Sequence, residues 1–190
     1  MDQKRAAIEA NAIENQHGVV RRTDALAGGL NPRQIGRRVE RRQWLVGPGL
    51  GVYVLAEAAN DPLTRLAAAA MGCEAAAWGP SALALWGLRP FPQTPVVATA
   101  SQLHETIGVE VRSIAALGQL PLVERRGIPT ASLELAVISL AYLISERSLH
   151  DLIDQVIRDR LTTWEQLERV IVRYRRRWRS AHAAPRRGAR

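Results

Sequence analysis

Residues 31–42 read Asn31-Pro32-Arg33-Gln34-Ile35-Gly36-Arg37-Arg38-Val39-Glu40-Arg41-Arg42. Asparagine is a preferred N-cap and proline fits the first helical position, so this stretch predicts a helix that begins at residue 32. Ile35 and Val39 are four residues apart and share one face, which we expect to point inward. Arg33, Arg37 and Arg41 have the same spacing and share another face. The stretch therefore predicts a helix with an apolar side and an arginine side.

The segments on either side of this helix complete a supersecondary pattern. A helix over residues 3–16 is expected to end at His17-Gly18, where glycine supplies a left-handed cap. On the C-terminal side, two β-rich runs around a Gly/Pro-rich turn predict a hairpin. The remaining expected elements are an extended pair at residues 19–20, a short helix over 24–27 capped by Thr23, and hairpin strands at 44–46 and 52–55. This order is that of a winged helix-turn-helix, which we place at residues 1–57 and expect to bind DNA on its own.

A helix with these two faces is suited to reading DNA. Its apolar face can pack on the helices behind it, while arginine can bind guanine or a phosphate and glutamine can bind adenine. The wing loop contains no basic residue, so we assign it no minor-groove contact. The alternative is a solvated amphipathic helix from a GC-rich genome, because Lys4 alone among the 26 basic residues is a lysine. The candidate DNA-binding residues are Arg21, Arg22, Arg33, Gln34, Arg37, Arg38 and Arg41.

Beyond residue 57, the pattern predicts a small mixed α/β domain over residues 58–179 that ends in helices, so the fold class is α+β. Thr163 and Gln166 have the spacing of a capping box and mark the start of the last helix. The other expected elements are a helix over 62–73 capped by Asp61, a short helix through Trp86 capped by Ser81, strands at 96–100 and 107–112, a turn at 127–129, and helices over 132–143 and 148–161. Residues 180–190 lack a pattern and are expected to form a disordered basic tail.

The formal net charge of +8 lies mainly near the C-terminus, because residues 158–190 carry eleven basic and three acidic side chains. A basic run with interleaved aromatic residues, here Tyr174 and Trp178, can hold nucleic acid. The same run can bind an acidic protein surface, or be a solvated helix end whose charge complements the helix dipole. All three interpretations stay open for Arg173, Arg175, Arg176, Arg177 and Arg179.

The sequence contains no P-loop, GxGxxG or GxSxG motif. The acidic residues near the C-terminus interleave with apolar positions, so we expect them on exposed helix faces and not around a metal; they are Asp151, Asp154, Asp159 and Glu165. The single cysteine, Cys73, excludes an internal disulfide and is expected to be buried, and the four histidines are expected to be structural or solvated. With neither a leader-like segment nor a membrane span, we expect a cytoplasmic protein that is not an enzyme and needs no cofactor or metal.

Six short motifs follow one another along the chain: Gln16-His17-Gly18-Val19-Val20, Leu30-Asn31-Pro32-Arg33-Gln34-Ile35, Arg38-Val39-Glu40-Arg41, Gly49-Leu50-Gly51-Val52-Tyr53, Pro80-Ser81-Ala82-Leu83-Ala84-Leu85-Trp86-Gly87-Leu88 and Gly127-Ile128-Pro129-Thr130. In this order, over about residues 5–160, the chain resembles the AbiEi-type antitoxin family of bacterial type IV toxin-antitoxin systems. It departs from that family at Ala131-Ser132-Leu133-Glu134, where a run containing Ser-Pro is commoner.

The resemblance implies a winged-helix head that represses its own operon, followed by an α/β antitoxin domain. It also implies a nucleotidyltransferase-like toxin, encoded beside the antitoxin, as the partner. We therefore expect a sequence-specific repressor and antitoxin that binds double-stranded DNA at its own promoter. The alternative is a protein-interaction antitoxin whose winged helix is degenerate and binds DNA only non-specifically.

Overall fold

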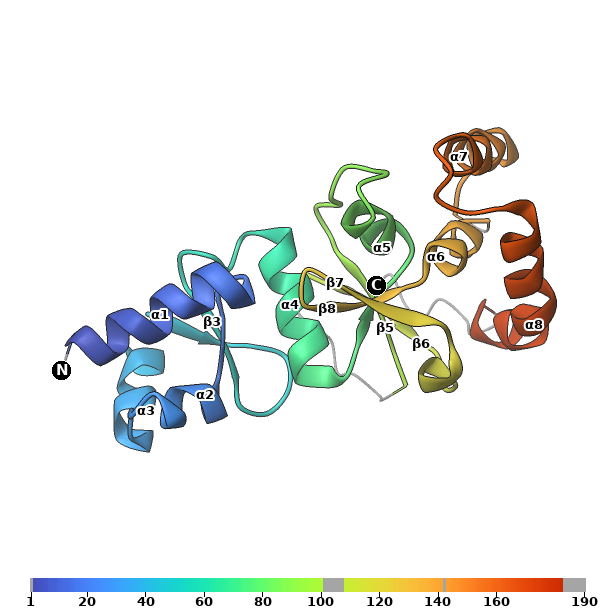
Figure 1. The fold of residues 1–190 in the computed structure, drawn as a ribbon. Helices are drawn as coiled ribbons and strands as arrows, with labels where there is room; N and C mark the ends of the chain where they lie inside the picture. Colours follow the sequence, from blue (N-terminus) through green and yellow to red (C-terminus); the bar gives the residue numbers. More distant parts are fainter. Residues whose placement is uncertain (1, 101–107, 142, 183–190) are drawn as a thin grey trace, which may run out of the picture.

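The computed structural model describes residues 2–100, 108–141 and 143–182, and its fold is α+β, as the sequence predicts. Figure 1 shows an elongated molecule with the first three helices at one end and the last two at the other. The N-terminal part, called the head below, comprises α1 (Asp2–Gln16), β1 (Val19–Arg21), α2 (Arg22–Ala27), α3 (Pro32–Glu40), β2 (Trp44–Val46) and β3 (Val52–Leu55). This order confirms the winged helix-turn-helix arrangement.

The wing is the antiparallel hairpin of β2 and β3, and β1 pairs antiparallel with the other side of β3. Helix α2 begins one residue before the expected N-cap Thr23, so that Thr23 lies inside the helix and Arg21 takes the N-cap position. The backbone N–H of Arg22 donates to the Gly51 carbonyl oxygen at 2.7 Å. A contact with the wing, which no local sequence signal encodes, thus fixes where α2 starts.

The head has a small core of its own. Trp44 is fully buried in it, and its indole Nε1 donates to a carboxylate oxygen of Glu9 on α1 at 3.0 Å. Arg5 holds the same carboxylate from one turn earlier on α1. The buried residues of this core are Ala12, Val20, Ala25, Leu30, Ile35, Trp44 and Leu55.

The rest of the chain, called the body below, is built around a five-stranded sheet of order β6-β5-β4-β8-β7. The pairs β4–β8 and β5–β6 are parallel, and β4–β5 and β7–β8 are antiparallel. The elements of the body are α4 (Pro62–Cys73), β4 (Ala76–Ala77), α5 (Gly79–Leu85), β5 (Val96–Thr99), β6 (Glu110–Ser113), a 3-10 turn (Leu117–Gln119), β7 (Leu122–Arg125), β8 (Ile128–Ala131), α6 (Leu133–Ser139), α7 (Glu146–Arg158) and α8 (Trp164–His182).

Several body boundaries differ from the expected ones. The turn expected at residues 127–129 lies at Arg126-Gly127, because Ile128 already begins β8. Ser81 lies inside α5 instead of capping it, since its hydroxyl accepts a hydrogen bond from the Val96 N–H at 2.7 Å. The strand β4, which pairs with both β5 and β8, was not expected.

The helices after the sheet also end elsewhere than expected. Helix α6 ends at Ser139, and Leu143, expected within that helix, is exposed. Helix α7 begins at Glu146 with Ser145 as its cap. Helix α8 continues through residues 180–182, which we expected to belong to a tail, and residues 183–190 lie outside the described residues. No helix in the described ranges is both long and apolar enough to cross a membrane.

The boundary expected at residue 57 crosses a shared hydrophobic core. Val19, Val52 and Val54, from β1 and β3, belong to the same buried cluster as Leu66 of α4. Burying a valine stabilises a fold by about 1.5 kcal/mol or more. A fragment that ends at residue 57 would expose all three valines, so the head depends on the body for part of its stability.

Two further contacts fix the head against the body. Gly49 in the wing loop and Gly72 in α4 approach so closely that a Cβ on either would overlap the backbone of the other segment. The ring Nε2 of His17, at the end of α1, donates to the Arg126 carbonyl oxygen at 2.8 Å. The head is therefore packed on the body and is not joined to it by a free linker.

Candidate DNA-binding face

The start of α3 is fixed by a complete capping box. The Asn31 side-chain oxygen accepts a hydrogen bond from the Gln34 N–H at 2.9 Å, and the Gln34 side-chain oxygen accepts one from the Asn31 N–H at 2.8 Å. Pro32 occupies the first helical position, as expected. The amide oxygen of Gln34 is thus engaged in the cap, and the structure gives Gln34 a capping role. Its reading of adenine stays a prediction.

The inner side of α3 packs on the core of the head. Ile35 is 1% exposed, and Val39 is half-buried against the same core. Trp44, directly after the helix, lies behind it with its ring 5.8 Å from that of Tyr53. The expected apolar face of the helix is thus confirmed, and it sets which side of α3 is turned to solvent.

Arg38 belongs to this inner side and not to the arginine face. Its side chain is half-buried, and Nη1 donates to the Gln34 carbonyl oxygen at 2.8 Å. Its guanidinium carbon lies 5.4 Å from the centre of the Trp44 ring, which is within the range of a cation–π contact. Arg38 was expected to contact DNA, but through these contacts its side chain stabilises the packing of α3 on Trp44.

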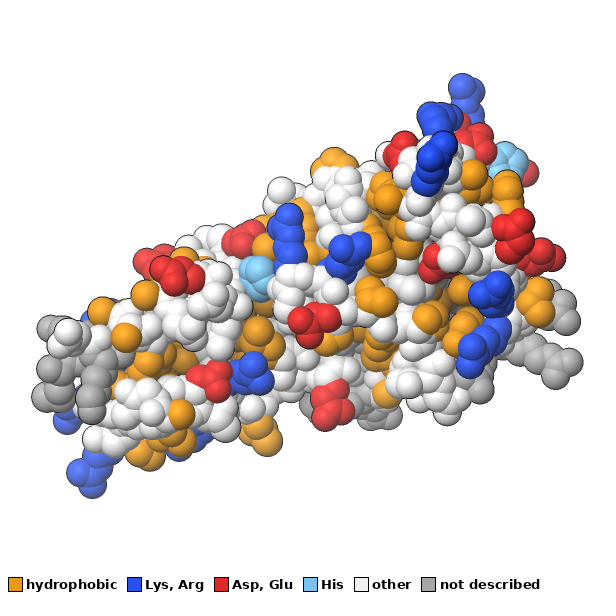
Figure 2. All heavy atoms as spheres, in the orientation of Figure 1, with side chains coloured by type: hydrophobic (Ala, Val, Ile, Leu, Met, Phe, Trp, Pro, Cys, Tyr) orange, Lys and Arg blue, Asp and Glu red, His pale blue; other side chains and the backbone are white. Residues whose placement is uncertain are grey.

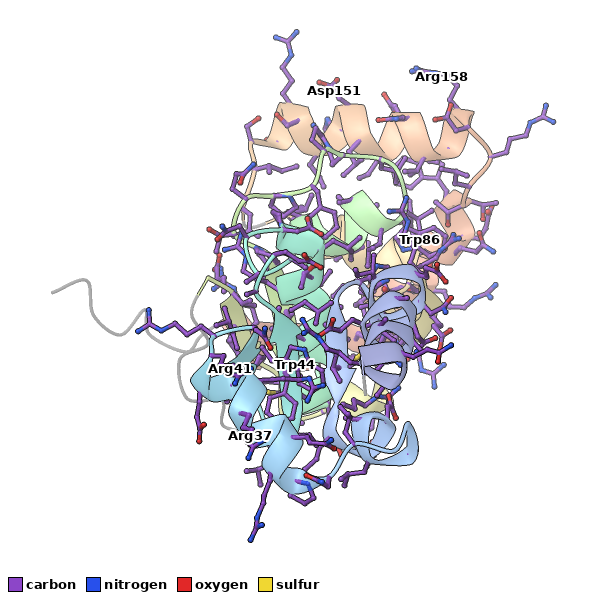
Figure 3. All side chains as sticks on the ribbon, turned by 90° about the vertical axis from the view of Figure 1, so that its left-hand side faces the viewer. Arg37, Arg41, Trp44, Trp86, Asp151 and Arg158 are labelled. Carbon is purple, nitrogen blue, oxygen red and sulfur yellow. The ribbon has the colours of Figure 1, made fainter. Side chains whose placement is uncertain are left out.

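The outer side of α3 carries the three arginines that share four-residue spacing. Arg33, Arg37 and Arg41 are all exposed. In the described part of the chain, none of the three side chains forms a hydrogen bond, ion pair or cation–π contact. Figure 3 shows Arg37 and Arg41 on the outside of α3, with Trp44 behind the helix. Their donors and charges are available to an external ligand.

Arg21 and Arg22 flank this face at the junction of β1 and α2, and both are exposed. Arg21 forms an ion pair with Asp24 at 3.4 Å, which offsets part of its charge. Arg22 Nη1 lies 3.5 Å from the Tyr53 hydroxyl, so its guanidinium is turned toward the wing. On the face drawn in Figure 2, basic and acidic side chains alternate over the middle of the molecule, and basic side chains project at the lower left edge over α2 and α3.

The second basic region, on α8, lies at the opposite end of the molecule from α3 (Figure 1). Thr163 and Gln166 form the expected capping box at its start. Tyr174 is buried, and the exposed Arg173 places its guanidinium carbon 5.4 Å from the Tyr174 ring centre. Arg175, Arg176, Arg177 and Arg179 lie in the last turns of α8, and their side chains are outside the described part of the structure.

Helix α8 also carries apolar side chains that nothing in the described structure covers. Trp164, Ile171 and Val172 are exposed, and their spacing of seven and eight residues places them on one side of the helix. The hydroxyl of Thr163, with backbone hydrogen bonding, holds the pKa of Glu165 below its ordinary value, so this first-turn residue stays negative beside the helix N-terminus. An exposed tryptophan next to aliphatic side chains is typical of a protein-contact surface.

The remaining polar candidates do not come together. Asp151, Asp154, Asp159 and Glu165 are exposed, as expected, and Figure 3 shows Asp151 on the outer side of α7. Over the ranges that the structure covers, no three His, Cys, Asp or Glu side chains gather where they could hold a metal ion. Cys73 is buried, as expected, and burial raises the pKa of its thiol.

Comparison with known proteins adds one finding on the fold. No family model and no curated protein matches this sequence. A solved structure does: the crystal structure of RV2827C protein from Mycobacterium tuberculosis is similar with a TM-score of 0.55 and 19% sequence identity. The similarity covers 90% of this chain and 71% of that chain. At this identity the likeness supports the arrangement of the head and body together, and nothing about activity.

Two functional features of the head were missed from the sequence. Arg22 lies beside the wing because of the Arg22–Gly51 backbone hydrogen bond, which is a long-range contact without a local signal. The capping role of Gln34 did have a signal, because Asn31 and Gln34 have the same spacing as Thr163 and Gln166.

Proposed function

We propose that this chain is a transcriptional repressor that binds double-stranded DNA sequence-specifically through α3. The observation that carries the proposal is the set of three exposed guanidiniums, Arg33, Arg37 and Arg41, which have no partner in the described chain. Arginine binds guanine bidentately in the major groove, and it binds phosphate in the same way. The proposal assigns the chain to the cytoplasm and assigns it no catalytic step, cofactor or metal.

The geometry of α3 supports specific reading over simple charge attraction. Four helical residues advance about 6 Å along the axis, and stacked base pairs are about 3.4 Å apart. Successive arginines on this face are therefore about two base pairs apart. The capping box at Asn31 and the Arg38–Trp44 contact hold the helix in one orientation, which direct readout requires.

A mobility-shift titration of the full chain tests this proposal. The probe is the DNA segment immediately upstream of the coding sequence, and the control is a shuffled duplex of the same length and composition. We expect binding to the upstream segment to be at least about a thousandfold tighter. Equal affinity for the two duplexes would contradict specific binding and would support the degenerate winged helix with only non-specific binding.

A second role, as the antitoxin of a nucleotidyltransferase-like toxin, is supported by the resemblance to AbiEi-type antitoxins and by α8. Its exposed Trp164, Ile171 and Val172 form an apolar strip, and the exposed Glu168 lies on the same side of the helix. We propose that this strip contacts the toxin, whose complementary surface would be apolar with a basic group opposite Glu168.

Two variants separate this role from DNA binding. In cells that express the toxin encoded beside this gene, Trp164→Ala should reduce rescue of growth, because it removes the largest exposed side chain of the strip. Arg37→Ala should retain rescue, since Arg37 lies at the other end of the molecule. Full rescue by Trp164→Ala, or loss of rescue in both variants, would contradict a toxin contact on α8.

A further inference from the structure

The tip of the wing is apolar. The loop between β2 and β3 consists of residues 47–51, and Leu50 within it is 103% exposed, the highest exposure among the large apolar side chains described. Val46, at the end of β2, is 70% exposed. A single exposed leucine needs no explanation in a soluble protein. The surroundings of Leu50, described next, are what distinguish it.

The loop that carries Leu50 is held firmly in place. The Gly47 N–H donates to the Val52 carbonyl oxygen at 2.9 Å, which closes the hairpin. Gly49 has a positive φ of 83° and lies against Gly72 of α4 with no room for a side chain on either residue. The body of the protein thus supports the loop from behind, and Leu50 projects from a rigid support.

A cation from another element accompanies this apolar tip. The Arg22 N–H donates to the Gly51 carbonyl oxygen at 2.7 Å, and a Cβ on Gly51 would lie 3.3 Å from the Arg22 Cβ. The Arg22 guanidinium reaches the Tyr53 hydroxyl on β3. The wing loop has no basic residue of its own, and the start of α2 supplies one beside it.

The wing loop and α3 lie on the same side of the molecule. In Figure 1 the loop between β2 and β3 lies on the same side of the molecule as α2 and α3, beside the C-terminal end of α4. When a helix occupies a major groove, elements that flank it meet the neighbouring phosphates and the adjacent minor groove. Apolar side chains such as leucine are used as wedges in minor grooves.

We propose that Leu50 enters the minor groove next to the segment read by α3, and that Arg22 binds a phosphate at the edge of this groove, which revises our expectation that the wing loop makes no minor-groove contact. This inference rests on the DNA binding proposed above. Leucine has no hydrogen-bonding group, so it distinguishes bases by shape. The guanine N2 amino group fills the floor of the minor groove, and A·T pairs leave it open. The wing therefore favours A·T pairs beside the α3 site.

Protection from dimethyl sulfate tests the proposal, because this reagent methylates guanine N7 in the major groove and adenine N3 in the minor groove. The probe is the duplex upstream of the coding sequence, bound by the full chain. We expect protection of guanine N7 at the α3 site and of adenine N3 beside it. In Leu50→Ala we expect the guanine protection to remain, the adenine protection to disappear, and affinity to fall about tenfold.

Leu161→Ala is the matched control, since it also truncates an exposed leucine, between α7 and α8 at the far end of the molecule. It should leave both protections unchanged, and all three proteins should unfold at the same temperature. Guanine protection without adenine protection in the unsubstituted chain would overturn the wing proposal alone. Adenine protection that persists in Leu50→Ala would overturn the role of Leu50. Absence of both protections in the unsubstituted chain would overturn DNA binding by α3 and this inference with it.

Discussion

Two adjacent arginines on α3 should behave in opposite ways when replaced by alanine. Arg37 is exposed and forms no side-chain contact within the described structure, while Arg38 donates to the Gln34 carbonyl and lies over Trp44. Arg37→Ala should weaken DNA binding and leave stability unchanged. Arg38→Ala should lower stability and leave the DNA-contacting side chains in place.

The contacts of Arg38 set the size of its effect. A hydrogen bond from a charged group contributes about 1.5–3 kcal/mol, and a cation–π contact contributes about 0.5–2 kcal/mol. Together these would be about 2–5 kcal/mol for a fully buried side chain; because Arg38 is only half-buried, we expect a smaller loss of about 1–2 kcal/mol. For a chain of this length the melting temperature should fall by about 2–8 °C.

Arg37→Ala should change stability by less than about 0.5 kcal/mol, as is usual for an exposed residue without partners. If Arg37 binds a guanine bidentately, its removal should weaken specific binding by about 1–3 kcal/mol, which is about 5- to 150-fold in affinity. Arg158→Ala is the charge-matched control. Arg158 is exposed on α7, away from α3 in Figure 3, so its loss should affect neither property.

Thermal unfolding and fluorescence anisotropy with the upstream duplex, at a temperature well below unfolding, measure both properties. If Arg38→Ala weakens binding as much as Arg37→Ala without lowering the melting temperature, then Arg38 contacts DNA and the division of α3 into two faces is wrong. If Arg37→Ala destabilises the chain by more than about 1 kcal/mol, Arg37 has a structural partner and is not available to a ligand.

Three other predictions follow from the same structure. On a duplex of about 40 base pairs, deleting residues 175–190 should weaken binding to all sequences alike and make binding less dependent on salt. On a duplex of about 12 base pairs it should change nothing, because α8 and α3 lie at opposite ends of the molecule. Lost discrimination between sequences would contradict this. Gly36→Ala should raise stability by about 0.5–1 kcal/mol in thermal unfolding, because nothing lies within 4 Å of the added Cβ, and a fall would show that this space is filled. Cys73 should react slowly with iodoacetamide at pH 8 in the folded chain and quickly once the chain is unfolded, since burial raises the pKa of its thiol and leaves little thiolate. Rapid reaction of the folded chain would contradict the burial of Cys73.

The parts of the fold that are set by residues close together in the sequence could be predicted from the sequence. The start of α3 at Pro32, the cap of α4 at Asp61 and the capping box at Thr163 all rest on side chains that bond within one helical turn. The winged-helix order follows from such local signals taken together. The start of α2 and the strand β4 could not be predicted, because contacts distant in sequence set them.

The candidate site divides in the same way. Periodicity placed Arg33, Arg37 and Arg41 on one side of α3, and the structure confirms that all three are exposed. Periodicity could not show that Arg38 turns inward, because this depends on Trp44, which lies in the following strand. Nor could it show that three valines of the head are buried in one cluster with Leu66 of α4, so that the head depends on the body for part of its stability. DNA binding by residues 1–57 alone stays a prediction.

The central claim is that the arginines on the outer side of α3 read DNA sequence. The most direct measurement is the ratio of affinities for the upstream duplex and for its shuffled counterpart, in the full chain and in the triple variant Arg33→Gln, Arg37→Gln, Arg41→Gln. We predict a ratio of about a thousand or more in the unsubstituted chain and a ratio near one in the variant, with the melting temperature unchanged. A variant that still discriminates between the duplexes as well as the unsubstituted chain would contradict the claim.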